Sequence, residues 1–156
     1  RAPADTLRRV NELLRADTRS GMFVTLFYGI LDTETGELAL ASAGHNPAYL
    51  RRRHGELVRL ACRGIALGVI ARPVFEEMRT RIEPGDALVL YTDGVTESFD
   101  PEEREFGEEG LQAALRSAQA TDAEPLLEAI ARAVSGFVRG AGQADDLTML
   151  VVTRDS

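Results

Sequence analysis

Two short segments constrain the fold most, because each joins a strand-like apolar run to aspartate. In residues 88–97 (LVLYTDGVTE), a run suited to a buried strand stops at the pair Asp93-Gly94. In residues 142–152 (GQADDLTMLVV), the pair Asp145-Asp146 directly precedes a second such run. If the two strands pair antiparallel, the end of the first lies beside the start of the second. The sequence therefore predicts that these carboxylates meet at one edge of a sheet.

Such a meeting of carboxylates is the geometry of a site for a hard metal ion. Carboxylates held together at the end of a rigid sheet repel one another unless cations lie between them. Oxygen ligands of this kind suit Mg²⁺ or Mn²⁺, whereas two histidines and one cysteine without ligand spacing argue against zinc. In a simpler interpretation, Asp-Gly is only a turn and Asp-Asp only a strand entry. The residues alone leave the two interpretations equally open.

The composition narrows the class of protein. A chain of 156 residues, 44% hydrophobic, predicts one globular domain, and no apolar run approaches the ~20 residues of a membrane span. The net charge of -7 argues against nucleic acid or an anionic membrane surface as the main partner. The single cysteine, Cys62, excludes an internal disulfide and indicates a reducing compartment, so we expect a cytoplasmic protein. We interpret Cys62 itself as a packed small residue.

The pattern of apolar residues and turn signals predicts an α+β domain. We expect helices over residues 3–16, 106–118 and 122–139, the last with Asp122 as N-cap. We expect strands over residues 22–31, 37–42, 48–52, 56–60 and 74–82, a strand that ends at Asp93, and a strand over 147–153. Residues 22–31 read as a central strand, and the first four strands form two hairpins. Hairpin-linked strands with segregated helices indicate a layered sandwich of antiparallel sheets flanked by helices.

Three further features have two interpretations each. His45, in a Gly-His-Asn-Pro turn, either donates a proton or braces the turn, and we favour the brace. The arginines of the segment 51–63 form either a solvated face, which we favour, or a docking surface for an acidic phosphoprotein; they are Arg51, Arg52, Arg53, Arg59 and Arg63. The acidic residues of 93–110, apart from Asp93, read as a solvated loop and the first turn of a helix.

Five blocks occur in a fixed order along the chain: FVTLFYGILD (23–32), AGHNPAYL (43–50), LGV (67–69), PGDALVLYTDGVTES (84–98) and DDLTMLVV (145–152). They resemble the metal-dependent PPM (type 2C) serine/threonine phosphatases. The resemblance is to the bacterial branch that is similar to the stage II sporulation protein E and includes stress-response phosphatases. It spans about residues 20–153.

The resemblance implies a fold, an activity and a site. The fold is two antiparallel sheets flanked by helices. The activity is hydrolysis of phosphoserine or phosphothreonine, by metal-activated water, on a bacterial regulatory protein of the anti-anti-sigma type. By motif, Asp93 and Asp145 are the catalytic metal ligands for Mn²⁺ or Mg²⁺, a pair of ions in the complete domain. Gly94 and Asp146 support them, and no residue is assigned to substrate binding.

One departure from the family pattern concerns a further metal-bridging aspartate. The family carries it in an upstream Asp-x-x-Gly block, and no Asp-x-x-Gly occurs in this sequence. Because the chain starts at Arg1 rather than Met, we expect the block to precede it. Residues 1–156 would then be a single domain, the larger C-terminal part of a PPM-type phosphatase domain, folded but inactive when isolated. The alternative is a catalytically incomplete regulatory or scaffolding module with the same fold.

Overall fold

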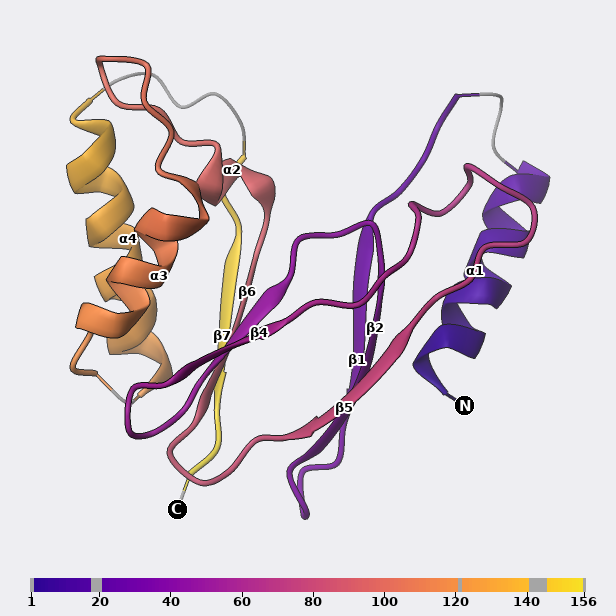
Figure 1. Cartoon of the computed structure of the whole chain (residues 1–156), viewed down its shortest axis with the longest axis horizontal. Coiled ribbons are helices and arrows are strands. Elements are labelled where there is room, and N and C mark those ends of the chain that lie inside the picture. The colour runs from indigo at the N-terminus through magenta and orange to yellow at the C-terminus, as the bar shows by residue number, and fades with distance from the viewer. Residues whose placement is uncertain (1, 18–20, 121, 141–145, 156) are drawn as a thin grey trace. The chain divides into compact units, whose positions relative to one another are not determined.

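The computed structural model describes residues 2–17, 21–120, 122–140 and 146–155. The chain forms two compact units, one of Arg1–Pro47 with Leu60–Ile82 and the other of Ala48–Arg59 with Glu83–Ser156 (Figure 1). Each unit combines an antiparallel sheet with helices, which confirms the predicted α+β class. Among the described residues, no helix is long and apolar enough to cross a membrane.

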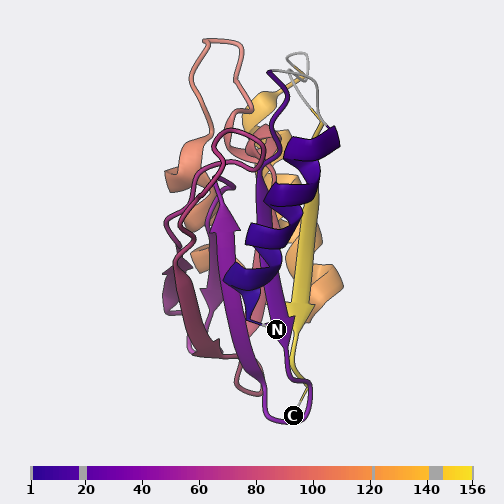
Figure 2. The same ribbon diagram turned by 90° about the vertical axis from the view of Figure 1, so that its right-hand side faces the viewer.

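The first unit is a three-stranded sheet covered by one helix. Its strands are β1 (Leu26–Leu31), β2 (Glu37–Ala43) and β5 (Glu77–Arg81), paired antiparallel in the order β1-β2-β5. Helix α1 (Pro3–Asp17) lies over β1 and β2, as Figure 2 shows. Its apolar stripe closes a core whose buried members are Ala4, Leu7, Ala41, Ala43, Leu67 and Phe75.

Two expectations for the segment 22–31 are wrong. Residues 22–25 lie outside the strand, and Val24 instead forms an isolated bridge with Leu67 through two backbone hydrogen bonds of 3.0 and 2.8 Å. Within the described sheet, β1 lies at an edge and pairs only with β2. The apolar run does not reflect burial on both faces here, because every residue of β1 is intermediate or exposed. An apolar run also says nothing of how many neighbouring strands the backbone pairs with, so it cannot separate a central strand from an edge strand.

The second unit contains a four-stranded sheet. Its strands are β3 (Ala48–Arg51), β4 (Leu57–Leu60), β6 (Ala87–Tyr91) and β7 (Met149–Thr153), in the order β4-β3-β6-β7. Helices α3 (Gly107–Ser117) and α4 (Ala123–Val138) cover one face of it (Figure 1). The shared core includes Tyr49, Val89, Val95, Leu111, Leu115, Leu126 and Ile130. Burial of each such aliphatic side chain contributes roughly 1.5–3 kcal/mol.

Two strand boundaries in this unit differ by two residues from the prediction, and one predicted cap forms no side-chain hydrogen bond. The strand expected to end at Asp93 ends at Tyr91, and Asp93 opens a short helix, α2 (Asp93–Thr96), that the sequence pattern did not reveal. Asp122 precedes α4 as expected, but its side chain makes no capping hydrogen bond within the described chain. The last strand begins at Met149 and not at residue 147.

The basic segment is a solvated face only in part, because Arg53, Arg59 and Arg63 are exposed and the other two arginines are not. Arg51 is only 6% exposed, and its guanidinium donates to the carbonyl oxygens of Ala118 and Ala120, which ties β3 to the end of α3. Arg52 pairs with Asp86 at 2.7 Å, and Arg59 forms a forked pair with Glu108. Sequence spacing gave no sign of these partners, because each lies more than 30 residues away along the chain.

The acidic segment after α2 is mostly the expected solvated loop and first helical turn, and Asp100 is the exception. Asp100 is 2% exposed and accepts hydrogen bonds from the backbone N–H groups of Glu102 and Arg104 and from the Arg104 side chain. Burial raises the pKa of the Asp100 carboxyl, but the bonds from Arg104 outweigh it and the pKa is lowered overall. The carboxylate therefore organises this loop from within.

Candidate functional site

The site is built where β6 ends and β7 begins. The two strands pair antiparallel, with Leu90 opposite Leu150 and Tyr91 opposite Met149. Beyond the strands, the backbone N–H of Thr92 donates to the carbonyl oxygen of Thr148 at 3.0 Å. The antiparallel arrangement predicted from the two aspartate segments is therefore confirmed.

Gly94 allows these two segments to approach closely. A Cβ at this position would lie 2.4 Å from the carbonyl oxygen of Asp146 and 3.0 Å from its carbonyl carbon. No other residue type fits there without a shift of the backbone. This contact places the backbone of Asp146 against the residue that follows Asp93.

Asp93 presents an exposed carboxylate on a fixed backbone. Its carbonyl oxygen accepts from the backbone N–H of Glu97 at 2.7 Å and from the hydroxyl of Thr96 at 3.1 Å. Its carboxylate accepts one hydrogen bond, from the N–H of Gly94 at 3.1 Å, within the part of the chain that the structure describes. An ionised carboxylate offers about four acceptor positions, so most of the capacity of Asp93 is left for another ligand.

Asp145 lies outside the described residues, so its predicted approach to Asp93 stays a prediction. Asp146 is described and exposed. In residues 2–17, 21–120, 122–140 and 146–155, no three or more His, Cys, Asp or Glu side chains gather closely enough to hold a metal ion. The oxygen donors at this end of the β6–β7 ladder fit Mg²⁺ or Mn²⁺ in type, and the described residues supply only part of a ligand set.

Sequence reasoning missed Thr92. Its hydroxyl oxygen accepts from the backbone N–H of Thr148 at 3.1 Å and donates to the carbonyl oxygen of Asp146 at 3.3 Å. The one available signal was a hydroxyl residue immediately before Asp-Gly, since such residues often bond to nearby backbone at strand and helix ends.

Behind the site, β6 is anchored by a pair of tyrosines. The ring of Tyr91 stacks on that of Tyr49, with centroids 6.3 Å apart and planes inclined by 15°. The Tyr49 hydroxyl donates to Glu108 at 2.8 Å, and Arg59 holds the same carboxylate at 3.1 Å. Burial is the main cause that raises the pKa of Tyr91, so the phenol is neutral and its ring serves as packing.

His45 lies in the other unit and braces its turn. Its backbone N–H donates to the hydroxyl oxygen of Ser42 at 3.2 Å, that hydroxyl donates to the His45 carbonyl oxygen, and its ring Nδ1 is 3.3 Å from the hydroxyl of Thr25. These contacts agree with the bracing interpretation. Cys62 is half-buried, and burial raises the pKa of its thiol, as expected for a packed residue.

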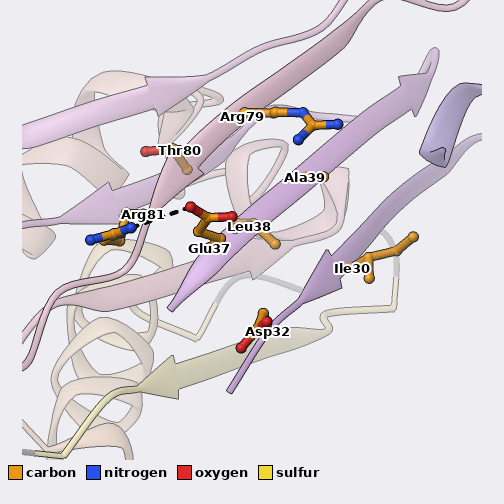
Figure 3. A pocket seen from close by; sticks show the side chains of 8 residues that line it. All are labelled: Ile30, Asp32, Glu37, Leu38, Ala39, Arg79, Thr80 and Arg81. Atoms are coloured by element: carbon orange, nitrogen blue, oxygen red, sulfur yellow. Dashed lines mark hydrogen bonds and ion pairs between the residues drawn. The ribbon is translucent and has the colours of Figure 1, made fainter. Parts of the chain in front are cut away.

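A depression of about 410 Å³ lies on the sheet of the first unit (Figure 3). Arg81 and Glu37 form an ion pair of 3.2 Å across it, and Ile30 and Arg79 lie farther along the same sheet. The lining residues are Ile30, Asp32, Glu37, Leu38, Ala39, Arg79, Thr80 and Arg81. None of the predicted site residues lines it.

The fold is that of PP2C-type phosphatase domains. The model of the stage II sporulation protein E (SpoIIE) family matches residues 1–155, and the chain belongs to this family. Protein IcfG of Synechocystis is 35% identical over 134 residues, which are 86% of this chain and 21% of that protein. Phosphoserine phosphatase RsbU of Bacillus subtilis is 30% identical over 96 residues, 61% of this chain and 29% of that protein. The chain thus spans less than a third of either relative.

Solved structures share the fold. The PP2C domain of SiaA from Pseudomonas aeruginosa is similar with a TM-score of 0.81 and 23% identity, over 99% of this chain and 61% of that one. The Mn-presoaked phosphatase domain of SpoIIE from Bacillus subtilis is similar with a TM-score of 0.74 and 20% identity, over 97% and 65%. These likenesses confirm the predicted fold class, and the family model confirms the predicted family resemblance.

Proposed function

We propose that this chain is the larger C-terminal part of a metal-dependent protein serine/threonine phosphatase domain. The observation that carries the proposal is the close approach of Gly94 to Asp146, which brings the two aspartate segments of a SpoIIE-family chain to one end of the β6–β7 ladder. An acidic strand end of this kind repels a phosphorylated substrate unless cations reverse the local charge.

In this proposal, Asp93 and Asp145 hold Mn²⁺ or Mg²⁺, and Gly94 and Asp146 support them. Bound ions would supply an activated water and positive charge for the phosphoryl oxygens. The chain's own contribution is to fix the ligands. The carbonyl oxygen of Asp93 is held by Glu97 and Thr96, and its carboxylate keeps free acceptor positions. A further aspartate, from a segment preceding Arg1, would complete the set for two ions.

The proposed substrate is a phosphorylated bacterial regulatory protein of the anti-anti-sigma type, cleaved at phosphoserine or phosphothreonine. The similarity to phosphoserine phosphatase RsbU supports a phosphoserine substrate. The net charge of -7 agrees with a protein partner and not with nucleic acid.

A direct test uses the full-length protein and a phosphoserine peptide. Hydrolysis is measured during titration with Mn²⁺ for the wild type, Asp93→Asn and Asp145→Asn, with Asp155→Asn as a matched control at an exposed position outside the site. We expect Mn²⁺-dependent turnover that both site variants lose and the control keeps. Normal turnover of Asp93→Asn at saturating Mn²⁺ would refute the assignment.

A second candidate is a regulatory or scaffolding module that kept the fold and lost catalysis. It is favoured by the lack of any Asp-x-x-Gly in the sequence and by the lack of a three-carboxylate cluster among the described residues. The same titration separates the two: a module binds no second ion and shows no Mn²⁺-dependent turnover in the full-length protein.

A further inference from the structure

The hydrogen bonds of Thr92 depart from a regular antiparallel ladder. In such a ladder every other pair of opposed residues exchanges two backbone hydrogen bonds, and Thr92 and Thr148 stand opposite each other at a hydrogen-bonded position. Thr92 donates the first, from its N–H to the carbonyl oxygen of Thr148 at 3.0 Å. The second should run from the N–H of Thr148 to the carbonyl oxygen of Thr92. That carbonyl oxygen instead accepts from the N–H of Val95 at 3.0 Å, in the turn that enters α2.

The side chain of Thr92 replaces the missing acceptor. Its hydroxyl oxygen accepts from the N–H of Thr148 at 3.1 Å, and the same hydroxyl donates to the carbonyl oxygen of Asp146 at 3.3 Å. A hydroxyl has one donor and two acceptor positions, so one side chain can hold two points of the segment 146–148. The chain can therefore turn away from the sheet at Asp93 without releasing that segment.

We propose that Thr92 is a positioning residue, which holds the backbone of Asp146 beside Asp93 and thereby sets the affinity of the site for its metal. The proposal rests on the proposed function. Asp93 directly follows Thr92, and the bond from the Thr92 hydroxyl to the Asp146 carbonyl oxygen holds Asp146 by its backbone. Since affinity for a hard ion depends on how rigidly its ligands are held, loss of this hydroxyl weakens binding although no ligand is removed.

The test measures Mn²⁺ affinity of the full-length protein, by the electron paramagnetic resonance signal of free Mn²⁺. Thr92→Val removes the hydroxyl and keeps the shape, Thr92→Ser keeps the hydroxyl, and Thr153→Val makes the same change at the far end of β7, opposite Ala87. We expect Thr92→Val to weaken Mn²⁺ binding by about 10- to 100-fold, the range for groups that orient metal ligands. Thr92→Ser and Thr153→Val should bind as the wild type does.

Circular dichroism first establishes that each variant is folded at the temperature of the titration, and Thr92→Ala replaces Thr92→Val if the latter is not. Wild-type affinity in the folded hydroxyl-free variant overturns the inference, because a purely structural hydroxyl would change the unfolding temperature alone. Failure of Thr92→Ser to restore binding also overturns it. Asp93→Asn is titrated alongside: if it binds Mn²⁺ normally, the proposed function fails, whereas loss in Asp93→Asn with normal binding in Thr92→Val refutes the role of Thr92 alone.

Discussion

Two aspartates flank strand β6, and they have opposite environments. Asp86 immediately precedes the strand, is 2% exposed, and accepts hydrogen bonds from the Arg52 side chain at 2.7 Å, the Arg53 N–H at 3.0 Å and the Glu83 N–H at 2.9 Å. Asp93 follows the strand, is exposed, and accepts one bond from Gly94 within the described chain. The same side chain is thus saturated at one end of the strand and available at the other.

The difference shows how one residue type serves structure or chemistry. A buried carboxylate is tolerated only when its acceptor positions are filled and an opposite charge is near, which Asp86 achieves through Arg52. A carboxylate that binds an external cation must keep acceptor positions empty, and Asp93 meets this condition for its proposed role. Occupancy of the carboxylate oxygens, and not the position at a strand end, separates the two roles.

The largest effect is expected when the exposed aspartate, Asp93, is replaced. In the full-length protein, Asp93→Asn should lower kcat for a phosphoserine peptide by more than the roughly 10- to 100-fold typical of residues that only orient metal ligands. The unfolding temperature without metal should stay equal or rise slightly, because one anionic charge leaves the site. Discontinuous phosphatase assays measure kcat, and a thermal melt measures the unfolding temperature. A large drop in the unfolding temperature would count against a ligand role.

The next largest effect is expected when the buried aspartate, Asp86, is replaced. Asp86→Ala leaves the Arg53 and Glu83 N–H groups without their acceptor and Arg52 without its charge partner. We expect a loss of about 2–4 kcal/mol in the free energy of unfolding, measured by urea denaturation. Asp86→Asn, which keeps an acceptor oxygen, should lose less. Mn²⁺ affinity of the variant that remains folded should not change, and a change would mean that the two ends of β6 are coupled.

A smaller effect is expected at Gly94, where the two aspartate segments approach each other most closely. Gly94→Ala places a Cβ 2.4 Å from the Asp146 carbonyl oxygen, so the two segments must separate. We expect a loss of about 1–3 kcal/mol in unfolding free energy, typical of overpacking, together with weaker Mn²⁺ binding. Gly136→Ala is the control: it lies inside α4 with open space around it, and should stabilise the helix by about 0.5–1 kcal/mol. Equal behaviour of the two alanines would rule out the steric argument.

The smallest effect concerns a half-exposed carboxylate behind the same strand. The forked bond from Arg59 holds the pKa of Glu108 below its ordinary value of 4.5. Because the pKa of Glu108 is lower in the folded than in the unfolded protein, its ionised form stabilises the fold at pH values above the unfolded-state pKa. This contribution disappears as the pH falls through the folded-state pKa. Urea denaturation should therefore give the wild type a free energy of unfolding that is higher than that of Glu108→Gln by less than about 1 kcal/mol at pH 7. Near pH 2 the two should not differ.

The matched control for this prediction is Glu109→Gln, in the same turn of α3 but without a hydrogen bond or ion pair in the described part of the chain. It should change stability little at either pH. A difference between wild type and Glu108→Gln that persists in strong acid would show that packing, and not the Arg59 pair, makes the contribution.

The sequence by itself predicted much of the fold because its signals are local. Alternation, apolar runs and turn residues placed α1, α3, α4 and most strands within a few residues, and the two aspartate segments indicated the antiparallel β6–β7 pair. The assignments of Asp93, Gly94 and Asp146 to one site came from the same local patterns and from the family resemblance. The approach of Asp145 to Asp93 stays a prediction.

Only the tertiary structure decided which polar residues are partners. Thr92 meets Asp146 and Thr148 across 54 and 56 residues of sequence, Asp86 meets Arg52 across 34, and Arg51 reaches the end of α3 across 67. A local pattern records the propensity and burial of a residue, but a hydrogen bond depends on where a distant segment is brought by packing. For this reason the sequence identified the strand that leads to the site, whereas the contacts that hold the site together emerged only from the fold.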